Sequence, residues 1–136
     1  MLNLNVMLID KNLLDRVSGE AKESPRLRMN FNFHEGPESK AQRLLNALEI
    51  GTILPIHRHR ATAETYILLR GKIRVMFYDE MGAEVESFML DPLEGNYGVH
   101  IPVGQWHTLE VLESGSVIFE VKDGPYAPLQ EEDLLR

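Results

Sequence analysis

Two histidines and a glutamate lie close together in the stretch from Gly51 to Gly71 of the 136-residue chain. His57 and His59 are separated by one residue, and Glu64 follows shortly after them. Because side chains on a strand alternate between its two faces, histidines at this spacing point to the same side. Imidazole and carboxylate groups together suit zinc, iron, manganese or nickel. The stretch therefore predicts most of a site for one divalent transition metal.

A fourth candidate ligand follows later in the chain. Pro102-Val-Gly104 is typical of a turn, and His107 lies just after it, at the expected start of another strand. We expect its imidazole to join the first three groups inside the domain. The predicted metal ligands are His57, His59, Glu64 and His107. Such a set leaves one or two positions open on a metal that prefers five or six ligands, which is typical of catalytic or ligand-binding sites.

Four other polar residues are candidates for the surroundings of the metal. Tyr66 shares strand parity with Glu64, so its hydroxyl is a candidate acid or base, although a packed core tyrosine is an equally good interpretation. His34 lies in an irregular segment and is the second candidate acid or base. Arg43 and Asn46 are candidate substrate-binding residues, but arginines more often lie on the surface.

Short strands must position these residues, because the hydrophobic period after residue 40 is two. Runs rich in branched and aromatic residues follow one another, with turn residues such as Gly51, Gly71 and Gly115 between them. The expected strands are 43–49, 53–57, 64–70, 72–78, 84–90, 97–101, 107–112 and 116–122. Strands at this spacing with no helix between them predict an all-β domain, an antiparallel sandwich or barrel.

The N-terminal part has a different pattern. Residues 10–22 predict a short helix with Asp10 as its N-cap, and the polar, irregular residues 23–40 predict an arm near the mouth of the barrel. The expected organisation is an N-terminal segment, a β-barrel and a C-terminal tail over 1–40, 41–123 and 124–136. Apolar residues near the N-terminus alternate like an additional strand, which favours a homodimer in which they cover a sheet edge. These residues are Leu2, Leu4, Val6 and Leu8.

Composition narrows the classes of partner. The formal charge is −7, which argues against a nucleic-acid partner because there is no basic stripe to neutralise phosphates. There is no cysteine, so disulfides, thiolate ligands and cysteine nucleophiles are excluded. The N-terminus lacks the positive region of a signal peptide, and no apolar run approaches the ~20 residues of a membrane span. We expect a cytoplasmic protein with no membrane partner.

The two ligand-bearing stretches resemble the two motifs of the cupin superfamily. The first has the pattern G-x5-H-x-H-x4-E-x6-G and ends at Gly71, as the superfamily pattern does. The second departs slightly, with Asn96 at the expected leading glycine and Val111 at the closing asparagine. The resemblance implies a small jelly-roll barrel over residues 43–122 and a metal held by three histidines and one glutamate.

A narrower resemblance extends over nearly the whole chain. Several stretches are similar to the WbuC-type cupin-fold metalloproteins, whose genes often lie in bacterial O-antigen and surface-polysaccharide clusters. They are Ser24-Pro-Arg-Leu-Arg28, Arg43-Leu-Leu-Asn-Ala47, His57-Arg-His59, Leu69-Arg-Gly71 and Gly124-Pro-Tyr-Ala-Pro-Leu129. This resemblance implies a metal cupin and a carbohydrate-like small-molecule ligand.

Three functions fit these features. The first is an enzyme whose metal acts as a Lewis acid on a small sugar-like substrate, in an isomerisation, epimerisation or lyase reaction. The second is an iron-dependent dioxygenase, and the third is a non-catalytic module that binds a carbohydrate or sugar nucleotide. The fold alone does not choose among them, because one barrel hosts unrelated chemistries.

Overall fold

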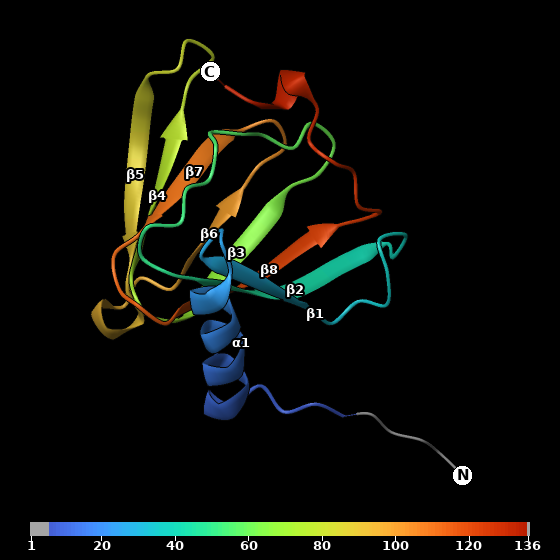
Figure 1. The fold of residues 1–136 in the computed structure, drawn as a ribbon. Coiled ribbons are helices and arrows are strands. Elements are labelled where there is room, and N and C mark those ends of the chain that lie inside the picture. Colours follow the sequence, from blue (N-terminus) through green and yellow to red (C-terminus); the bar gives the residue numbers. More distant parts are fainter. Residues whose placement is uncertain (1–5, 136) are drawn as a thin grey trace.

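The computed structural model describes residues 6–135 and contains one α-helix, eight strands and two short 3-10 helices within them (Figure 1). The elements, in chain order, are α1 (Lys11–Glu23), β1 (Arg28–Asn32), β2 (Ala41–Leu48), β3 (Glu64–Arg70), β4 (Ile73–Tyr78), β5 (Glu84–Leu90), η1 (Pro92–Glu94), β6 (Gly98–Ile101), β7 (Trp106–Val111), β8 (Ser116–Asp123) and η2 (Glu131–Asp133). Among residues 6–135, these helices are all too short or too polar to traverse a bilayer.

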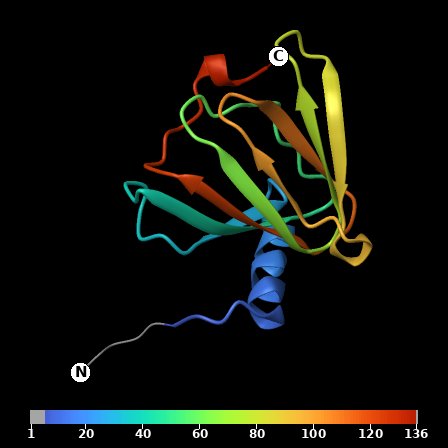
Figure 2. The same cartoon turned by 180° about the vertical axis from the view of Figure 1, so that it is seen from behind.

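The strands form two antiparallel sheets. One sheet has the order β1-β2-β8-β3-β6, and the other has the order β5-β4-β7. The sheets lie closest at the end near η1 and diverge towards the end where η2 lies (Figures 1 and 2). This arrangement confirms the expected all-β jelly-roll barrel with a short N-terminal helix. Strand order that skips neighbours in sequence, such as β8 between β2 and β3, is what brings distant residues to one face.

The five-stranded sheet separates two apolar clusters. Its outer face packs against α1. Leu45 and Val117 of the sheet belong to the same apolar cluster as Val17 of the helix. Its inner face contributes Leu48 and Ile118 to the core between the two sheets. Because side chains alternate along each strand, neighbouring residues of β2 and β8 serve opposite clusters. The helix therefore closes one face and leaves the inner face free to build a site.

The helix begins where the sequence predicts. Asp10 is its N-cap, and the Asp10 carboxylate accepts a hydrogen bond of 3.0 Å from the backbone N–H of Leu13. This bond satisfies one of the backbone donors that are left free in the first turn of a helix. The helix then runs to Glu23, one residue beyond the predicted end.

Gly71 lies where the chain leaves one sheet for the other, between β3 and β4. Its φ is +101°, and a Cβ atom at this position would collide with Ser116. Only glycine accepts both the left-handed backbone and the close approach without strain. The glycine that ends the first motif is therefore needed by the crossover that follows the Glu64 strand.

Two local expectations are wrong. Residues 28–32 were expected in an irregular arm, but they form β1, and their alternation of apolar Met29 and Phe31 with polar neighbours is the period-two signal of a strand. Residues 53–57 were expected as a strand, but only His57 pairs there, in isolated bridges. Pro55 removes one backbone donor from this run, which disfavours a regular ladder.

The N-terminal residues 6–10 form no strand in the single chain. They extend away from the domain beyond α1 (Figures 1 and 2), and Val6 and Leu8 are exposed. Leu2 and Leu4 lie outside the described residues.

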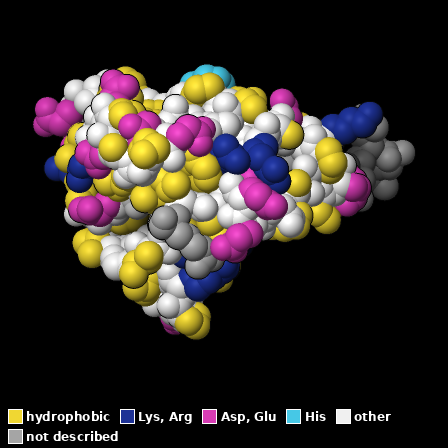
Figure 3. All heavy atoms as spheres, turned by 90° about the horizontal axis from the view of Figure 1, so that it is seen from above, with side chains coloured by type: hydrophobic (Ala, Val, Ile, Leu, Met, Phe, Trp, Pro, Cys, Tyr) yellow, Lys and Arg dark blue, Asp and Glu magenta, His cyan; other side chains and the backbone are white. Residues whose placement is uncertain are grey.

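On the face of the molecule in Figure 3, acidic, basic and apolar side chains are interspersed. The absence of a nucleic-acid partner stays a prediction.

The C-terminal tail binds the segment that carries the first histidines. Leu135 donates its backbone N–H to Ile56 (2.9 Å), and Arg58 donates its own to the carbonyl of Asp133 (3.0 Å). The Asp133 carboxylate is buried and forms an ion pair of 2.6 Å with Arg60. The tail thus replaces the strand partner that residues 53–57 lack in the sheets.

We expect Asp133→Asn to loosen this attachment and lower the free energy of unfolding by about 1–3 kcal/mol, the usual cost of losing a hydrogen-bonded charged partner. Glu132→Gln is the matched control, because it removes the same charge from the exposed neighbouring residue. Chemical denaturation of both variants measures the difference. Equal stability of the two would show that the tail is not held through Asp133.

Candidate metal centre

The backbone brings the first and last predicted ligands together. His57 donates its N–H to the carbonyl of His107 (3.0 Å), and His107 donates its N–H to the carbonyl of His57 (2.9 Å). This reciprocal pair is an isolated antiparallel bridge at the start of β7. It places the centroids of the two imidazole rings 4.3 Å apart. Two segments that are far apart in sequence thus present their side chains at one point.

His59 and Glu64 reach the same point from the other side. Glu64 is the first residue of β3 and lies opposite Ile101 and Lys122, on the inner face of the five-stranded sheet. The backbone of His59 is fixed by the N–H of Gly104, which donates to its carbonyl at 2.8 Å. The imidazole Nε2 of His59 contacts Glu64 Oε1 directly.

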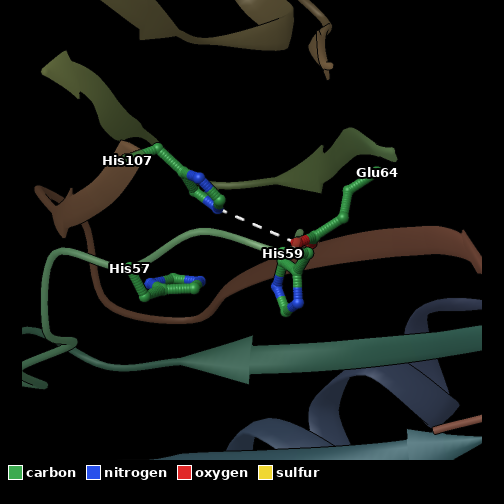
Figure 4. Close-up of side chains that lie close together, drawn as sticks. All are labelled: His57, His59, Glu64 and His107. Carbon is green, nitrogen blue, oxygen red and sulfur yellow. Dashed lines mark ion pairs between the residues drawn. The ribbon is translucent and has the colours of Figure 1, made fainter. Parts of the chain in front are cut away.

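The structure brings all four predicted ligands together, as Figure 4 shows. One nitrogen or oxygen from each side chain lies within 4.8 Å of those from the other three. Glu64 Oε1 is 3.8 Å from His107 Nε2. Glu64 and His107 are buried, and His57 and His59 are partly exposed, so the cluster is open to solvent on the side of His57 and His59.

The hydrogen bonds of two imidazoles determine which nitrogen is free. His57 Nδ1 lies 2.9 Å from the carbonyl oxygen of Pro55, and His107 Nδ1 lies 2.8 Å from that of Gln105. A carbonyl only accepts, so in each ring Nδ1 carries the proton and donates it. Nε2 is then left with a free lone pair. This is the arrangement in which a backbone partner orients a metal-binding histidine.

The charges of the cluster suit a cation. Burial lowers the pKa of His57 to about 4, with a further contribution from the charge of His107, so His57 is neutral at neutral pH. Burial also lowers the pKa of His107. Burial alone raises the pKa of Glu64, but the hydrogen bond and charge of His59 outweigh it and lower that pKa to about 2. Two neutral imidazoles therefore face an ionised carboxylate.

This donor set fits a single transition-metal ion. Imidazole nitrogens and a carboxylate oxygen are typical ligands of zinc, iron and manganese. Four protein ligands on one side leave room for a further ligand on the open side. The residues His57, His59, Glu64 and His107 can thus hold one divalent ion and expose it to a small molecule.

Tyr66 and Asn46 lie on the same face of the sheet as Glu64. The Tyr66 hydroxyl is 3.4 Å from His107 Nε2, and its side chain is only 4% exposed. Burial, followed by the charges of Glu64 and Glu120, raises the pKa of Tyr66 well above its usual value. The phenol thus keeps its proton at neutral pH. Asn46 lies two strands away on β2 and donates a hydrogen bond to Glu120.

Arg43 and His34 are not brought to the cluster. Arg43 is exposed and, by strand alternation, lies on the opposite face of β2 from Asn46. His34 Nδ1 lies 3.1 Å from the backbone N–H of Arg43, and its side chain lines a cavity whose lining includes none of the four predicted ligands. The substrate and acid–base roles of these two residues stay predictions.

Two residues on β8 belong to the site surroundings although sequence reasoning missed them. Glu120 lies opposite Tyr66 in the sheet register, and Lys122 lies opposite Glu64. The alternation along 116–123 could have indicated them, because a buried Ile118 places both on the same inward face. A cavity of about 640 Å³ lies beside Lys122 and His59, under the tail residues 124–130.

Two protein families match the chain, each over more than half of its length. Residues 51–136 match the family described as WxcM-like, C-terminal, and residues 9–90 match a domain of unknown function, DUF6016. A search of the curated proteins found no match. Neither family is described as WbuC-type, so that narrower resemblance stays a prediction.

Solved structures share the fold at low sequence identity. KdgF from a Halomonas species is 16% identical with a TM-score of 0.58, over 74% of this chain and 82% of that one. The capsular polysaccharide assembling protein CapF from Staphylococcus aureus is 21% identical with a TM-score of 0.62, over 77% of this chain. A variant of the oxalate decarboxylase OxdC from Bacillus subtilis is 24% identical with a TM-score of 0.57, over 74% of this chain.

The chain spans only 30% of CapF and 26% of OxdC, so it corresponds to a part of each. The metal-ligand pattern, the two-sheet barrel and these matches agree with one another. The chain is a cupin, and it belongs to the WxcM-like, C-terminal family through residues 51–136 and to the DUF6016 family through residues 9–90.

Proposed function

We propose that this chain is a metal-dependent cupin that binds one divalent transition-metal ion and acts on a small polyhydroxylated molecule. The observation that carries the proposal is the convergence of four donor atoms, with the Nε2 atoms of His57 and His107 left unprotonated because Nδ1 donates to a backbone carbonyl. A purely structural use of Glu64 and His107 would be costly, because both side chains are buried away from water. A bound cation offsets that cost.

The chemistry we propose is isomerisation, epimerisation or elimination. A bound metal would supply a Lewis acid for a carbonyl or for vicinal hydroxyls of the substrate. Tyr66 is well placed to donate a proton, because its hydroxyl lies beside His107 and burial keeps it protonated. The cavity beside His59 gives a small molecule access to the open side of the cluster.

The setting we propose is the metabolism of bacterial surface polysaccharides in the cytoplasm. Support comes from the structural likeness to CapF, a protein that is itself described as assembling capsular polysaccharide. The likeness shows the fold, and the carbohydrate setting is the part that we infer.

Metal binding tests the proposal directly. We expect the purified chain to bind one zinc or manganese ion and to gain thermal stability on loading, because a ligand that binds the folded state stabilises it. Glu64→Gln and His107→Gln should each weaken binding by at least about a hundredfold, since outer partners alone are worth ~10–100-fold. Calorimetric titration and elemental analysis give both quantities.

His100→Gln is the matched control for these variants. Its imidazole lies on the same sheet but hydrogen-bonds to Thr65 (3.0 Å) on the opposite face from Glu64. This variant should bind metal as the parent does. If the Glu64 and His107 variants bind metal with the affinity of the parent, the four residues are not the metal site.

We also propose that the chain forms a homodimer through the open edge of the three-stranded sheet. β5 is one of the two edge strands of this sheet (Figures 1 and 2). Leu90 is its only buried residue. Val85 is 61% exposed on this strand. Long apolar edge strands are normally paired with another strand or covered. In the proposed dimer, the same exposed strand of a second copy of the chain is the partner.

Light scattering at tens of micromolar should give twice the chain mass of 15.5 kDa. Val85→Lys should shift the mass towards the monomer, because it places a charge on the edge. Met81→Lys, in the exposed turn before β5, is the control and should leave the dimer intact. A parent chain that is monomeric under these conditions would reject the dimer.

A further inference from the structure

A second cavity lies on the inner face of the five-stranded sheet, beside Glu120 and Lys122, the residues of β8 that lie opposite Tyr66 and Glu64. Its volume is about 680 Å³, within the range of small-molecule sites. Its floor is built from the inward residues of β1, β2 and β8. The polar side chains that line it include Asn30, Asn32, Asn46, Glu120 and Lys122.

The sheet register shows that these polar residues occupy positions that are apolar elsewhere. Asn30 lies opposite Asn46, and Asn46 lies opposite Ile118, which is a core residue. Further along the same face, Leu44 lies opposite Glu120. The inner face therefore changes from hydrophobic to amide-rich towards β1. Asn30 and Asn32 are exposed, but Asn46 and Glu120 are buried, and packing does not explain an amide and a carboxyl at buried positions.

Asn46 and Glu120 form a buried pair in the cavity wall. Asn46 Nδ2 donates a hydrogen bond of 3.0 Å to Glu120 Oε1, and each residue is only 9% exposed. Asn46 Oδ1 is buried and has no hydrogen-bond partner within residues 6–135. Buried polar atoms in folded proteins are almost always satisfied. Because Asn46 also lines the cavity, this unsatisfied acceptor points to a ligand that donates a hydrogen bond to the amide.

The ionisation of Glu120 suits the same kind of ligand. Burial raises its pKa to about 7, with a further contribution from the charge of Glu64, and against the lowering effects of Asn46, Lys122 and His59. At neutral pH its carboxyl can both accept and donate hydrogen bonds. Hydroxyl groups also accept and donate hydrogen bonds, and an amide side chain offers them both an acceptor oxygen and a donor NH2 group.

We propose that this cavity is a carbohydrate subsite, in which Asn46 and Glu120 bind the ring hydroxyls of a neutral sugar and Asn30 and Asn32 extend the contact. The inference rests on the proposed function for its link to a reaction. Glu120 lies opposite Tyr66 in the register, and the Tyr66 hydroxyl lies beside His107, so one cross-strand pair separates the subsite from the metal cluster.

Nuclear magnetic resonance of the full chain tests the subsite. The probes are the methyl α-pyranosides of glucose, galactose and mannose, with tetrahydropyran as the same ring without hydroxyls. At least one glycoside should shift the side-chain amide resonances of Asn46 and of Asn30 or Asn32. Tetrahydropyran should shift none of them. If no glycoside shifts these resonances, the subsite is overturned.

Two variants and one control locate the binding. Glu120→Gln and Asn32→Ala should each weaken the glycoside about tenfold, as loss of one good hydrogen bond implies. Asn32 is exposed, so its variant keeps the test valid if Glu120→Gln fails to fold. Asn12→Ala removes an exposed amide from α1 and should change nothing. Unchanged affinity in both cavity variants would contradict the proposal.

The metal-free Glu64→Gln protein separates this inference from the proposed function. Glycoside shifts that persist in it would support the subsite even where metal binding had failed its own test. Normal metal loading without any glycoside shift would overturn the subsite and leave the metal centre standing.

Discussion

The reciprocal backbone hydrogen bonds between His57 and His107 are the constraint on which the rest of the site depends. The segment before β3 is irregular, so nothing else in the sheets would hold His57 at a defined position. The bridge joins it to β7, and the tail pairs on its other side through Leu134. Together these bonds hold the backbone of His57 on both sides, which favours metal binding because the ligands are then positioned before the ion arrives.

The inner face of the five-stranded sheet is divided between two tasks. Towards η1 it carries Leu48, Leu68 and Ile118, which form the core with the second sheet. Towards the open end it carries ionisable and amide groups, among them Glu64 and Glu120. Removing such groups from water is costly, and the apolar half of the same face offsets that cost by burying hydrocarbon. The core and the site are therefore one continuous surface, and α1 closes the opposite face so that this division is possible.

The main features of fold and metal centre could be predicted from the sequence, because they depend on local periodicity. The spacing of His57 and His59 predicted that they lie near each other, although their segment is not a regular strand, and Gly71 marked the crossover that ends the Glu64 strand. The two wrong strand predictions had physical causes. β1 was missed because prolines and glycines flank a short alternating run, and residues 53–57 look like a strand although Pro55 and the lack of a sheet partner prevent one.

By itself, the sequence determined the residue types and their spacing, and therefore the metal-ligand set, the strand content and the capped helix. Tertiary structure alone decided which faces those residues share. Glu120 and Asn46 are 74 residues apart and meet only because β8 inserts between β2 and β3. Alternation puts Arg43 on the other face from its neighbours Gln42 and Leu44, but only the packing of the barrel decides that Gln42 and Leu44 face inward and Arg43 outward. Pairing between distant strands is a non-local choice, set by the packing of the whole barrel, so no local pattern contains it.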